Sequence, residues 1–307
     1  MAKILGISAV RNEADIIGLT VLHHLQLGLD GIMVMDNGST DETKEVLQAV
    51  SKVDKRLQWF SDEQPFVQTS IATELAREAF RRGADWIVPF DADEFWVSQQ
   101  AKTSFRGLLE SSEAGSLWNL PVNYIQARHH TTFSPSALLD ATYRVYEAVP
   151  SGNLARQMLE ANQIGMVQTS WLRKHVSRPT SDIEIGRGNH SVEGIRGSSA
   201  KENGLRCLHI PLRSKAYLQT KMDDGQRLAE AGILEGAWHI WHWAREIQRG
   251  NLDKEWAANS QAAGQLDVHG ERYNLLYDSR LKETVQPLVK QAESIYEEVR
   301  ITPAASG

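Results

Sequence analysis

The N-terminal third of the chain alternates short apolar runs with longer segments of helical periodicity, and this alternation limits the possible folds most strongly. The apolar runs end in polar turns, so we expect them to be strands, over residues 3–10, 31–35, 57–60 and 86–90. The helical segments between them cover residues 15–27, about 40–50, and 68–82. Strands that alternate with helices form right-handed crossovers. The sequence therefore predicts an α/β fold with a mainly parallel, Rossmann-like mixed sheet flanked by helices.

The pattern is looser after residue 100. We expect further strands over residues 116–125, 141–149, 171–178 and 206–210, with a glycine-containing loop over 185–192. Helical patterns follow over residues 214–231, 238–249 and 279–299. We therefore expect one αβ domain over residues 1–213 and a helical C-terminal extension, residues 214–307, packed on it.

Length and composition set the class of protein. A chain of 307 residues can bury one large core, or one core with a smaller appendage. The hydrophobic content of 41% and charged content of 23% are ordinary for a globular protein. The net charge of −6 and the lack of any run of Lys or Arg argue against a nucleic-acid partner.

The chain has a single cysteine, Cys207, which excludes an intrachain disulfide and a cysteine metal cluster. A lone cysteine fits a reducing compartment. The apolar stretch at the start is too short for a signal peptide, and no window approaches the roughly 20 apolar residues of a membrane helix. We expect a cytoplasmic protein without a transmembrane segment.

Polar clusters follow three of the predicted strands, at residues 11–13, 36–41 and 91–94. Ligands of parallel sheets bind beyond the carboxyl ends of the strands. We therefore expect the three clusters to converge although the sequence separates them.

The third cluster contains Asp91, Asp93 and Glu94, directly after an apolar strand. Carboxylates this close repel one another unless a cation lies among them. Hard divalent ions such as Mg²⁺ or Mn²⁺ prefer oxygen ligands and bridge to phosphate. Solvated turn residues with a capping role are the alternative. The apolar residues on both sides of the cluster favour binding of a metal or ligand.

The motifs Val10-Arg11-Asn12-Glu13, Asp36-Asn37-Gly38-Ser39-Thr40-Asp41 and Asp91-Ala92-Asp93-Glu94-Phe95 together resemble those of a known family. In order and spacing they are similar to the family 2-like glycosyltransferases with a GT-A fold, in the branch with an Asp-x-Asp-Glu-Phe motif. A weaker likeness continues beyond residue 170, over residues 174–179, 188–192 and 208–214. The second motif alone would be only a left-handed turn and a helix cap, formed by Ser39 or Thr40.

The resemblance implies a glycosyltransferase that uses a nucleotide-sugar, with a UDP-sugar the expected donor and the hydroxyl of a carbohydrate or glycoconjugate the expected acceptor. By this likeness, four residues hold the nucleoside: Arg11, Asn12, Glu13 and Asp36. Asp91 and Asp93 hold Mn²⁺ or Mg²⁺ against the donor diphosphate, where the ion stabilises charge on the leaving group. Glu94 replaces the commoner fourth Asp, and its contact with sugar or metal stays open.

Later residues are implied in the same way. A late histidine serves as a further metal ligand in many GT-A enzymes, with His190 the first candidate here and His209 the second. A histidine that hydrogen-bonds the backbone is the alternative for each. Lys174, Arg178 and Arg213 can neutralise phosphate or lie solvated at the surface.

The resemblance also implies inversion by a single displacement, which needs a general base. Asp182 and Glu184 are the candidates, and both can equally be loop acids. The run 238–243 holds three tryptophans; a helical packing stripe is favoured over a sugar platform. The pair His129-His130 lacks zinc-site spacing, and we assign it no role.

Two other functions remain possible from the residues alone. A Mg-dependent nucleotidyltransferase or phosphohydrolase also combines an αβ sheet with acid-bound metal, but no glycine-rich phosphate loop follows the first strand. A binding module that has lost its chemistry is the other, and the intact pair of Asp91 and Asp93 argues against it.

Overall fold

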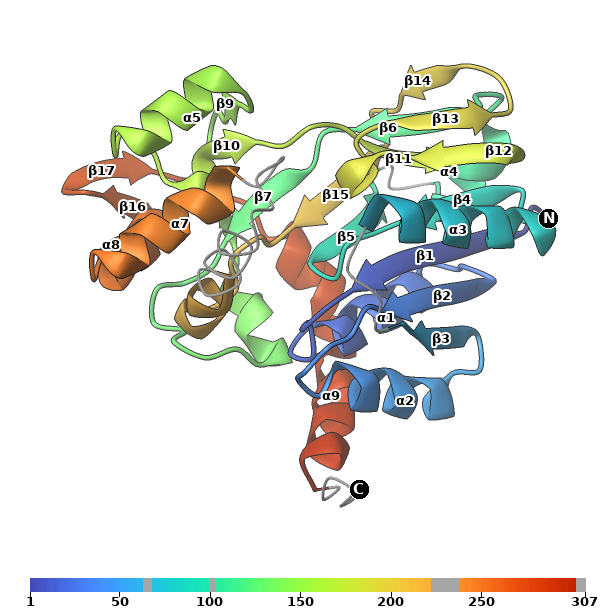
Figure 1. The fold of residues 1–307 in the computed structure, drawn as a ribbon, viewed down its shortest axis with the longest axis horizontal. Coiled ribbons are helices and arrows are strands. Elements are labelled where there is room, and N and C mark those ends of the chain that lie inside the picture. Colours follow the sequence, from blue (N-terminus) through green and yellow to red (C-terminus); the bar gives the residue numbers. More distant parts are fainter. Residues whose placement is uncertain (63–67, 100–102, 222–237, 302–307) are drawn as a thin grey trace. The chain divides into compact units, whose positions relative to one another are not determined.

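The computed structural model describes residues 1–62, 68–99, 103–221 and 238–301 (Figure 1). The chain forms two compact units, each assembled from segments distant in sequence. Unit 1 consists of Met1–Pro121, Leu172–Leu208 and Pro287–Gly307, and unit 2 of Val122–Trp171 and His209–Gln286. The division of the chain into a catalytic domain of residues 1–213 and an extension of 214–307 stays a prediction.

A seven-stranded mixed sheet forms the centre of unit 1, in the order β14-β6-β11-β4-β1-β2-β3. The strands β1, β2, β3 and β4 are parallel to one another, and β11 is antiparallel to β4 and β6. The strands are β1 (Ile4–Val10), β2 (Gly31–Asp36), β3 (Leu57–Ser61), β4 (Trp86–Pro89), β6 (Ser116–Asn119), β11 (Lys174–Ser177) and β14 (Ser199–Lys201). This arrangement confirms the predicted α/β class with a mainly parallel sheet.

Helices flank this sheet because each has an apolar face. They are α1 (Ile17–Gln26), α2 (Thr43–Val53), α3 (Gln68–Arg81) and α4 (Phe105–Ser111). The hairpin of β12 (Pro179–Ile185) and β13 (Val192–Ile195) packs on α3, and buried Ile183 and Ile185 join Leu75 in one apolar cluster. The short helix η3 (Arg187–Asn189) joins the two hairpin strands. The remaining strands of unit 1 are β5 (Glu94–Ser98) and β15 (Leu205–His209), whose last residue belongs to unit 2.

The C-terminal helix α9 (Arg280–Ile301) contributes its residues 287–301 to unit 1. There the backbone N–H of Gly18 donates to the hydroxyl of Tyr296 at 3.2 Å. A Cβ at Gly18 would lie 3.1 Å from that hydroxyl oxygen, so a residue without a side chain allows this approach. The predicted helix over residues 279–299 is confirmed.

Unit 2 has its own apolar core, which includes Trp243 and Trp256. Its helices include α5 (Asn153–Glu160), α7 (Trp238–Gln248) and α8 (Leu252–Asn259), and its strands include β7 (Val122–Ile125), β8 (Tyr143–Arg144), β9 (Val149–Pro150), β10 (Thr169–Ser170) and β18 (Leu276–Tyr277). Of the tryptophans in the run 238–243, Trp243 is buried and Trp241 is half-buried. The side chain of Trp238 lies outside the described residues.

The C-terminal portion that we expect to be helical also contains strands, namely β18 and a hairpin. Residues 265–274 form a hairpin of β16 (Gln265–Val268) and β17 (Glu271–Asn274). Its pattern has a period of two, because Leu266 and Val268 are buried while Gln265 and Asp267 are half-exposed. The turn at His269 and Gly270 has positive φ at both residues, which is typical of a tight hairpin.

Two strand predictions also need correction. Residues 141–149 contain only Tyr143–Arg144 and the start of Val149–Pro150 as strand, and residues 116–125 form two strands that break at Leu120 and Pro121. Proline has no N–H for a strand ladder, which favours such a break. Within the described part of the chain, no helix combines the length and apolar character that crossing a membrane requires.

Candidate functional site

The loops after β1 and β2 lie against each other, because Val10 and Asp36 are paired in the parallel register. The backbone N–H of Asn12 donates to the Ser39 hydroxyl at 2.9 Å, and the N–H of Thr40 donates to Oδ1 of Asn12 at 2.8 Å. Asn12 has φ of 54°, a conformation that asparagine adopts more readily than most residues. The convergence of the first two polar clusters is thus confirmed.

The cap expected of Ser39 or Thr40 is wrong, because α2 begins at Thr43 and neither side chain caps it. Oδ1 of Asp41 instead accepts the N–H of Thr43 at 3.1 Å, and Oδ2 of Asp41 accepts the N–H of Ala14 at 3.1 Å. The serine and threonine therefore connect the two loops and do not start the helix.

Glu13 has a structural role in the same place. Its backbone N–H donates to the Thr43 hydroxyl at 2.9 Å, and its carbonyl accepts the N–H groups of Ile16 and Ile17 at the start of α1. Its side chain is buried. These bonds fix the loop that begins with Arg11, whose buried Nε has no hydrogen-bond partner among the described residues.

Asp36 is fully buried at the end of β2. Its Oδ2 accepts the N–H of Ser39 and the hydroxyl of Ser61, each at 3.3 Å, and lies 3.8 Å from Nζ of Lys44. Its Oδ1 has no hydrogen-bond partner within the described ranges. A buried acceptor left without a donor costs free energy, so a ligand N–H or a water molecule at this atom would be favourable.

The acid cluster lies at the end of β4, beside β1. Asp91 and Asp93 are half-exposed, while Glu94 is 1% exposed. The cation among them is Lys174, at the start of β11. Its Nζ lies 2.7 Å from Oδ2 of Asp91 and 2.6 Å from Oε1 of Glu94.

The sequence left Lys174 either to neutralise phosphate or to lie solvated at the surface, and it did not reveal the partners of this buried side chain. Burial by itself would lower the pKa of the Lys174 ammonium, but the Asp91 and Glu94 carboxylates outweigh burial, so its pKa lies above the usual range and it stays charged. The one available signal was its position at the start of an apolar strand. Because Asp91 lies 83 residues before Lys174, the sequence alone does not show that these two side chains pair.

The acid cluster also has internal bonds that separate the roles of its members. The N–H of Asp91 donates to Oε2 of Glu94 at 3.1 Å, and the N–H of Glu94 donates to the carbonyl of Asp91. Buried Glu94 therefore supports the turn and balances Lys174. The half-exposed carboxylates of Asp91 and Asp93 are the oxygen donors that fit Mn²⁺ or Mg²⁺.

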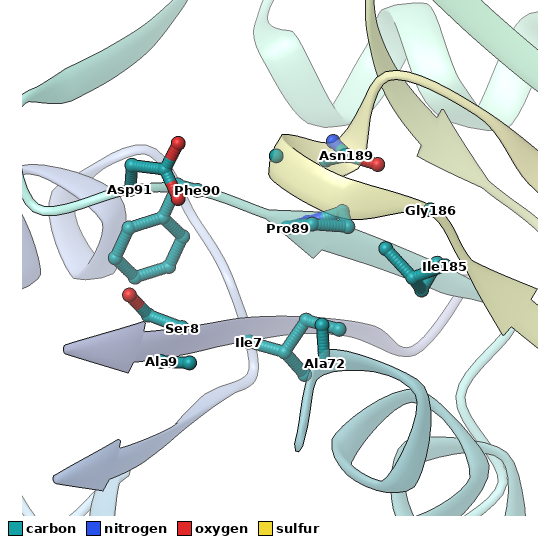
Figure 2. Close-up of a pocket in the computed structure, with 11 residues that line it drawn as sticks. Ile7, Ser8, Ala9, Ala72, Pro89, Phe90, Asp91, Ile185, Gly186 and Asn189 are labelled. Carbon is teal, nitrogen blue, oxygen red and sulfur yellow. The ribbon is translucent and has the colours of Figure 1, made fainter. Parts of the chain in front are cut away.

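A cavity lies at the carboxyl ends of β1 and β4 (Figure 2). Figure 2 shows Ser8 and Ala9 of β1 on one side and Gly186 and Asn189 on the other, with Asp91 at its rim. A Cβ at Gly186 would lie 2.1 Å from the Ser191 hydroxyl oxygen, so any side chain there would displace the Ser191 side chain. The cavity volume of about 30 Å³ admits water, and a larger ligand would require movement of its walls.

The two candidate histidines belong to different units. In unit 1, Nδ1 of His190 lies 3.1 Å from the carbonyl of Arg173, the residue before Lys174. A carbonyl only accepts, so the neutral ring carries its proton on Nδ1 and its lone pair on Nε2, as in metal-binding histidines. In unit 2, Nδ1 of His209 lies 2.8 Å from Oδ1 of Asn123, and the His209 ring packs edge-on against Trp171.

Asp182 and Glu184 lie on the exposed face of β12, alternating with buried Ile183 and Ile185. Oε1 of Glu184 is 3.5 Å from the Arg77 guanidinium. Neither acid lines the cavity beside Asp91.

The two predicted phosphate arginines have other contacts. Arg178 stacks on Trp86, at the start of β4 and so at the opposite end of that strand from Asp91. It does not join the acid cluster. Arg213 is buried in unit 2 over the ring of Tyr217.

No protein-family model and no curated protein match the sequence. Among solved structures, the chain is similar to mannosyltransferase PcManGT from Pyrobaculum calidifontis in complex with GDP-Man and Mn²⁺, with 14% identity, a TM-score of 0.39, and 97% of this chain and 82% of that one covered. It is also similar to S. aureus TarS 1-349 in complex with UDP-GlcNAc, with 12% identity, a TM-score of 0.38, and coverage of 81% and 72%. A third similar structure is glucosyl-3-phosphoglycerate synthase from Mycobacterium tuberculosis in complex with Mn²⁺, UDP and glucosyl-3-phosphoglycerate, with 14% identity, a TM-score of 0.34, and coverage of 89% and 87%.

Proposed function

We propose that the chain is a metal-dependent glycosyltransferase that moves a sugar from a nucleotide-sugar to a hydroxyl of a carbohydrate or glycoconjugate. The observation that carries this proposal is the pair of polar sites at neighbouring strand ends. Asp36 at the end of β2 offers a buried acceptor without a donor, and Asp91 and Asp93 at the end of β4 offer carboxylate oxygens. Only β1 lies between these two strands in the sheet.

The two sites suit the two ends of a nucleoside diphosphate. Oδ1 of Asp36 would accept an N–H of the base, and the loop of Arg11, Asn12 and Glu13 would hold the nucleoside beside it. Asp91 and Asp93 would hold Mn²⁺ or Mg²⁺, with His190, directly after η3, as a further ligand. When bound, the ion neutralises the diphosphate that leaves as the glycosidic bond breaks.

Lys174 supports this site through its ion pairs with Asp91 and Glu94. Its charge balances Asp91 and Glu94 before any ligand binds, so the acid cluster is held in place without a metal. The ammonium positions the Asp91 carboxylate at the strand end. Asp182 and Glu184 stay the candidates for a general base of an inverting transfer.

The proposal is tested with a panel of UDP-, GDP-, dTDP- and CMP-sugars incubated with the protein, with and without Mn²⁺. We expect metal-dependent release of a nucleoside diphosphate, or of the monophosphate in the case of a CMP-sugar, from one donor. Release of a nucleoside monophosphate and a sugar 1-phosphate from a UDP-, GDP- or dTDP-sugar would instead support the phosphohydrolase, and release of pyrophosphate in a parallel incubation with a nucleoside triphosphate and a sugar 1-phosphate would support the nucleotidyltransferase. Absence of any release, with or without a mixture of carbohydrate acceptors, would contradict the transferase.

Asp93→Asn is the sharpest variant for this assay, because it keeps the side-chain shape and removes the charge. The matched control is Asp85→Asn, one residue before the other end of β4. We expect product release to be lost in Asp93→Asn and retained in Asp85→Asn.

A further inference from the structure

Two histidines and an aspartate form a cluster in unit 2 that the proposed function does not use: His129, His130 and Asp140. Nε2 of His130 lies 2.9 Å from Oδ2 of Asp140, and Nε2 of His129 lies 3.4 Å from the same oxygen. One ligand atom from each residue lies within 4.8 Å of the other two. Both imidazole rings therefore face a single carboxylate oxygen.

A backbone turn explains how neighbours in sequence face the same group. In a strand, successive side chains point to opposite faces. Residues 128 and 129 instead form a turn, closed by the N–H of His130 donating to the carbonyl of Ala127 at 3.1 Å. The two imidazole centroids consequently lie 4.1 Å apart. Linear spacing of histidines does not reveal this arrangement.

Both parts of the cluster are attached to the core of unit 2. The carbonyl of His130 accepts the N–H of Lys215 at 3.2 Å, and the carbonyl of Arg128 accepts the indole N–H of buried Trp256 at 2.9 Å. Asp140 ends the short helix η1 (Pro135–Asp140), whose Ala137 and Leu138 are buried. Ligands on an anchored backbone lose less conformational entropy when they bind a cation.

Hydrogen bonding accounts for only one of the two contacts with Asp140. The 2.9 Å contact of His130 is ordinary for N–H···O, whereas the 3.4 Å contact of His129 exceeds the usual upper limit of about 3.2 Å. Around a tetrahedral Zn²⁺ with bonds of about 2.0–2.1 Å, neighbouring ligand atoms lie about 3.3 Å apart. The two observed separations lie on either side of this value.

We propose that His129, His130 and Asp140 bind Zn²⁺, with water as the fourth ligand. Two imidazole nitrogens and one carboxylate oxygen are a donor set that Zn²⁺ takes in proteins. Mg²⁺ and Mn²⁺ prefer oxygen donors, so this site and the acid cluster of unit 1 select different metals. The half-exposed to exposed side chains leave the site open to solution.

The test is isothermal titration of the full chain with ZnCl₂, together with visible absorption after addition of Co²⁺, which absorbs strongly in a four-coordinate site. We expect the wild type to bind Zn²⁺ and to give the four-coordinate Co²⁺ spectrum. His129→Gln and Asp140→Asn should each weaken Zn²⁺ binding by at least about 100-fold, the upper end of the effect of losing an outer-sphere partner. His129 is 70% exposed, so its substitution leaves the core of unit 2 intact.

Two variants serve as controls. His269→Gln removes another histidine of unit 2, and Asp93→Asn removes a carboxylate from the acid cluster of unit 1. Each variant should leave the four-coordinate Co²⁺ spectrum unchanged. Absence of Zn²⁺ binding by the wild type would overturn the site. Retention of full binding by a His129→Gln, Asp140→Asn double variant with a native circular dichroism spectrum would also overturn it.

Discussion

Lys174 is a buried lysine whose ammonium lies between the carboxylates of Asp91 and Glu94. Its side chain is 5% exposed and that of Glu94 is 1% exposed. Taking one member of such a group away leaves the others as uncompensated buried charges. The charge balance of the acid cluster therefore depends on Lys174, which lies on a strand more distant in the sequence, β11.

Lys174→Met should lower the free energy of unfolding by about 3–5 kcal/mol, because buried Glu94 loses its cation. Urea denaturation measures this change. The matched control is Lys215→Met, whose more exposed ion pair with Asp253 should contribute less than about 1 kcal/mol. Equal losses of unfolding free energy in the two variants would contradict the claim that the buried Lys174 ion pairs stabilise the fold more than an exposed pair does.

The limits of sequence reasoning are clearest for single residues. Asp36, Asp91 and Asp93 could be singled out because polar residues directly after apolar strands are visible locally. The partners of Lys174 and the facing of His129 and His130 could not, because they depend on strand pairing and on a turn. The alternation of Asp182 and Glu184 with two isoleucines is visible in the sequence. The sequence does not show that α3 covers the isoleucine face of this strand and leaves the two acids exposed.

Among the elements, α1 illustrates how a helix carries titratable groups into the core. His23 is 5% exposed, and its Nε2 lies 2.7 Å from the carbonyl of Trp96. Burial lowers the pKa of His23 to about 4 from 6.5, partly offset by that hydrogen bond. The ring of His24 is fully buried and stacks on Phe90, with centroids 3.9 Å apart.

The lowered pKa of His23 predicts a pH dependence with a definite sign. Between pH 6.5 and about 4 the unfolded chain binds a proton that the folded chain excludes, so stability falls as the pH falls through this window. The contribution of His23 is at most about 3 kcal/mol.

Urea denaturation at pH 7, 5.5 and 4.5 measures this dependence. His23→Gln can still donate to the Trp96 carbonyl and should reduce the loss of stability toward low pH. An unchanged pH dependence in this variant would contradict the role of His23.

The elements of the N-terminal third were predicted well because each one is local. Strands and helices there differ from the expected bounds by a few residues at most, since hydrophobic period and polar turns define them. The elements of residues 116–150 were predicted poorly. Strands of two residues, such as β8, leave too short a pattern to recognise.

At the scale of the whole molecule, unit 1 combines segments that are far apart in sequence. Residues 287–301 of α9 belong to the same unit as residues 1–121. Its buried face includes Ala292, Ile295 and Tyr296. Tyr296 reaches the backbone of α1 at Gly18. Unit 1 is therefore completed only when the last helix has been made.

Tyr296→Ala should destabilise unit 1 by about 3 kcal/mol, the cost of removing a large buried ring. Thermal unfolding followed by circular dichroism measures the change. Tyr277→Ala is the control, because the Tyr277 residue is 60% exposed and should cost much less. Equal stability of the two variants would contradict the packing of α9 on α1.

The central claim for the molecule is a metal-dependent nucleotide site at the carboxyl ends of β2 and β4. Isothermal titration of the full chain with UDP, GDP, dTDP and CMP, with and without Mn²⁺, tests it most directly. We predict that one nucleotide binds only with Mn²⁺, that Asp93→Asn abolishes this binding, and that Asp85→Asn retains it. Binding of none of the nucleotides in the presence of Mn²⁺, or undiminished binding by Asp93→Asn, would contradict the claim.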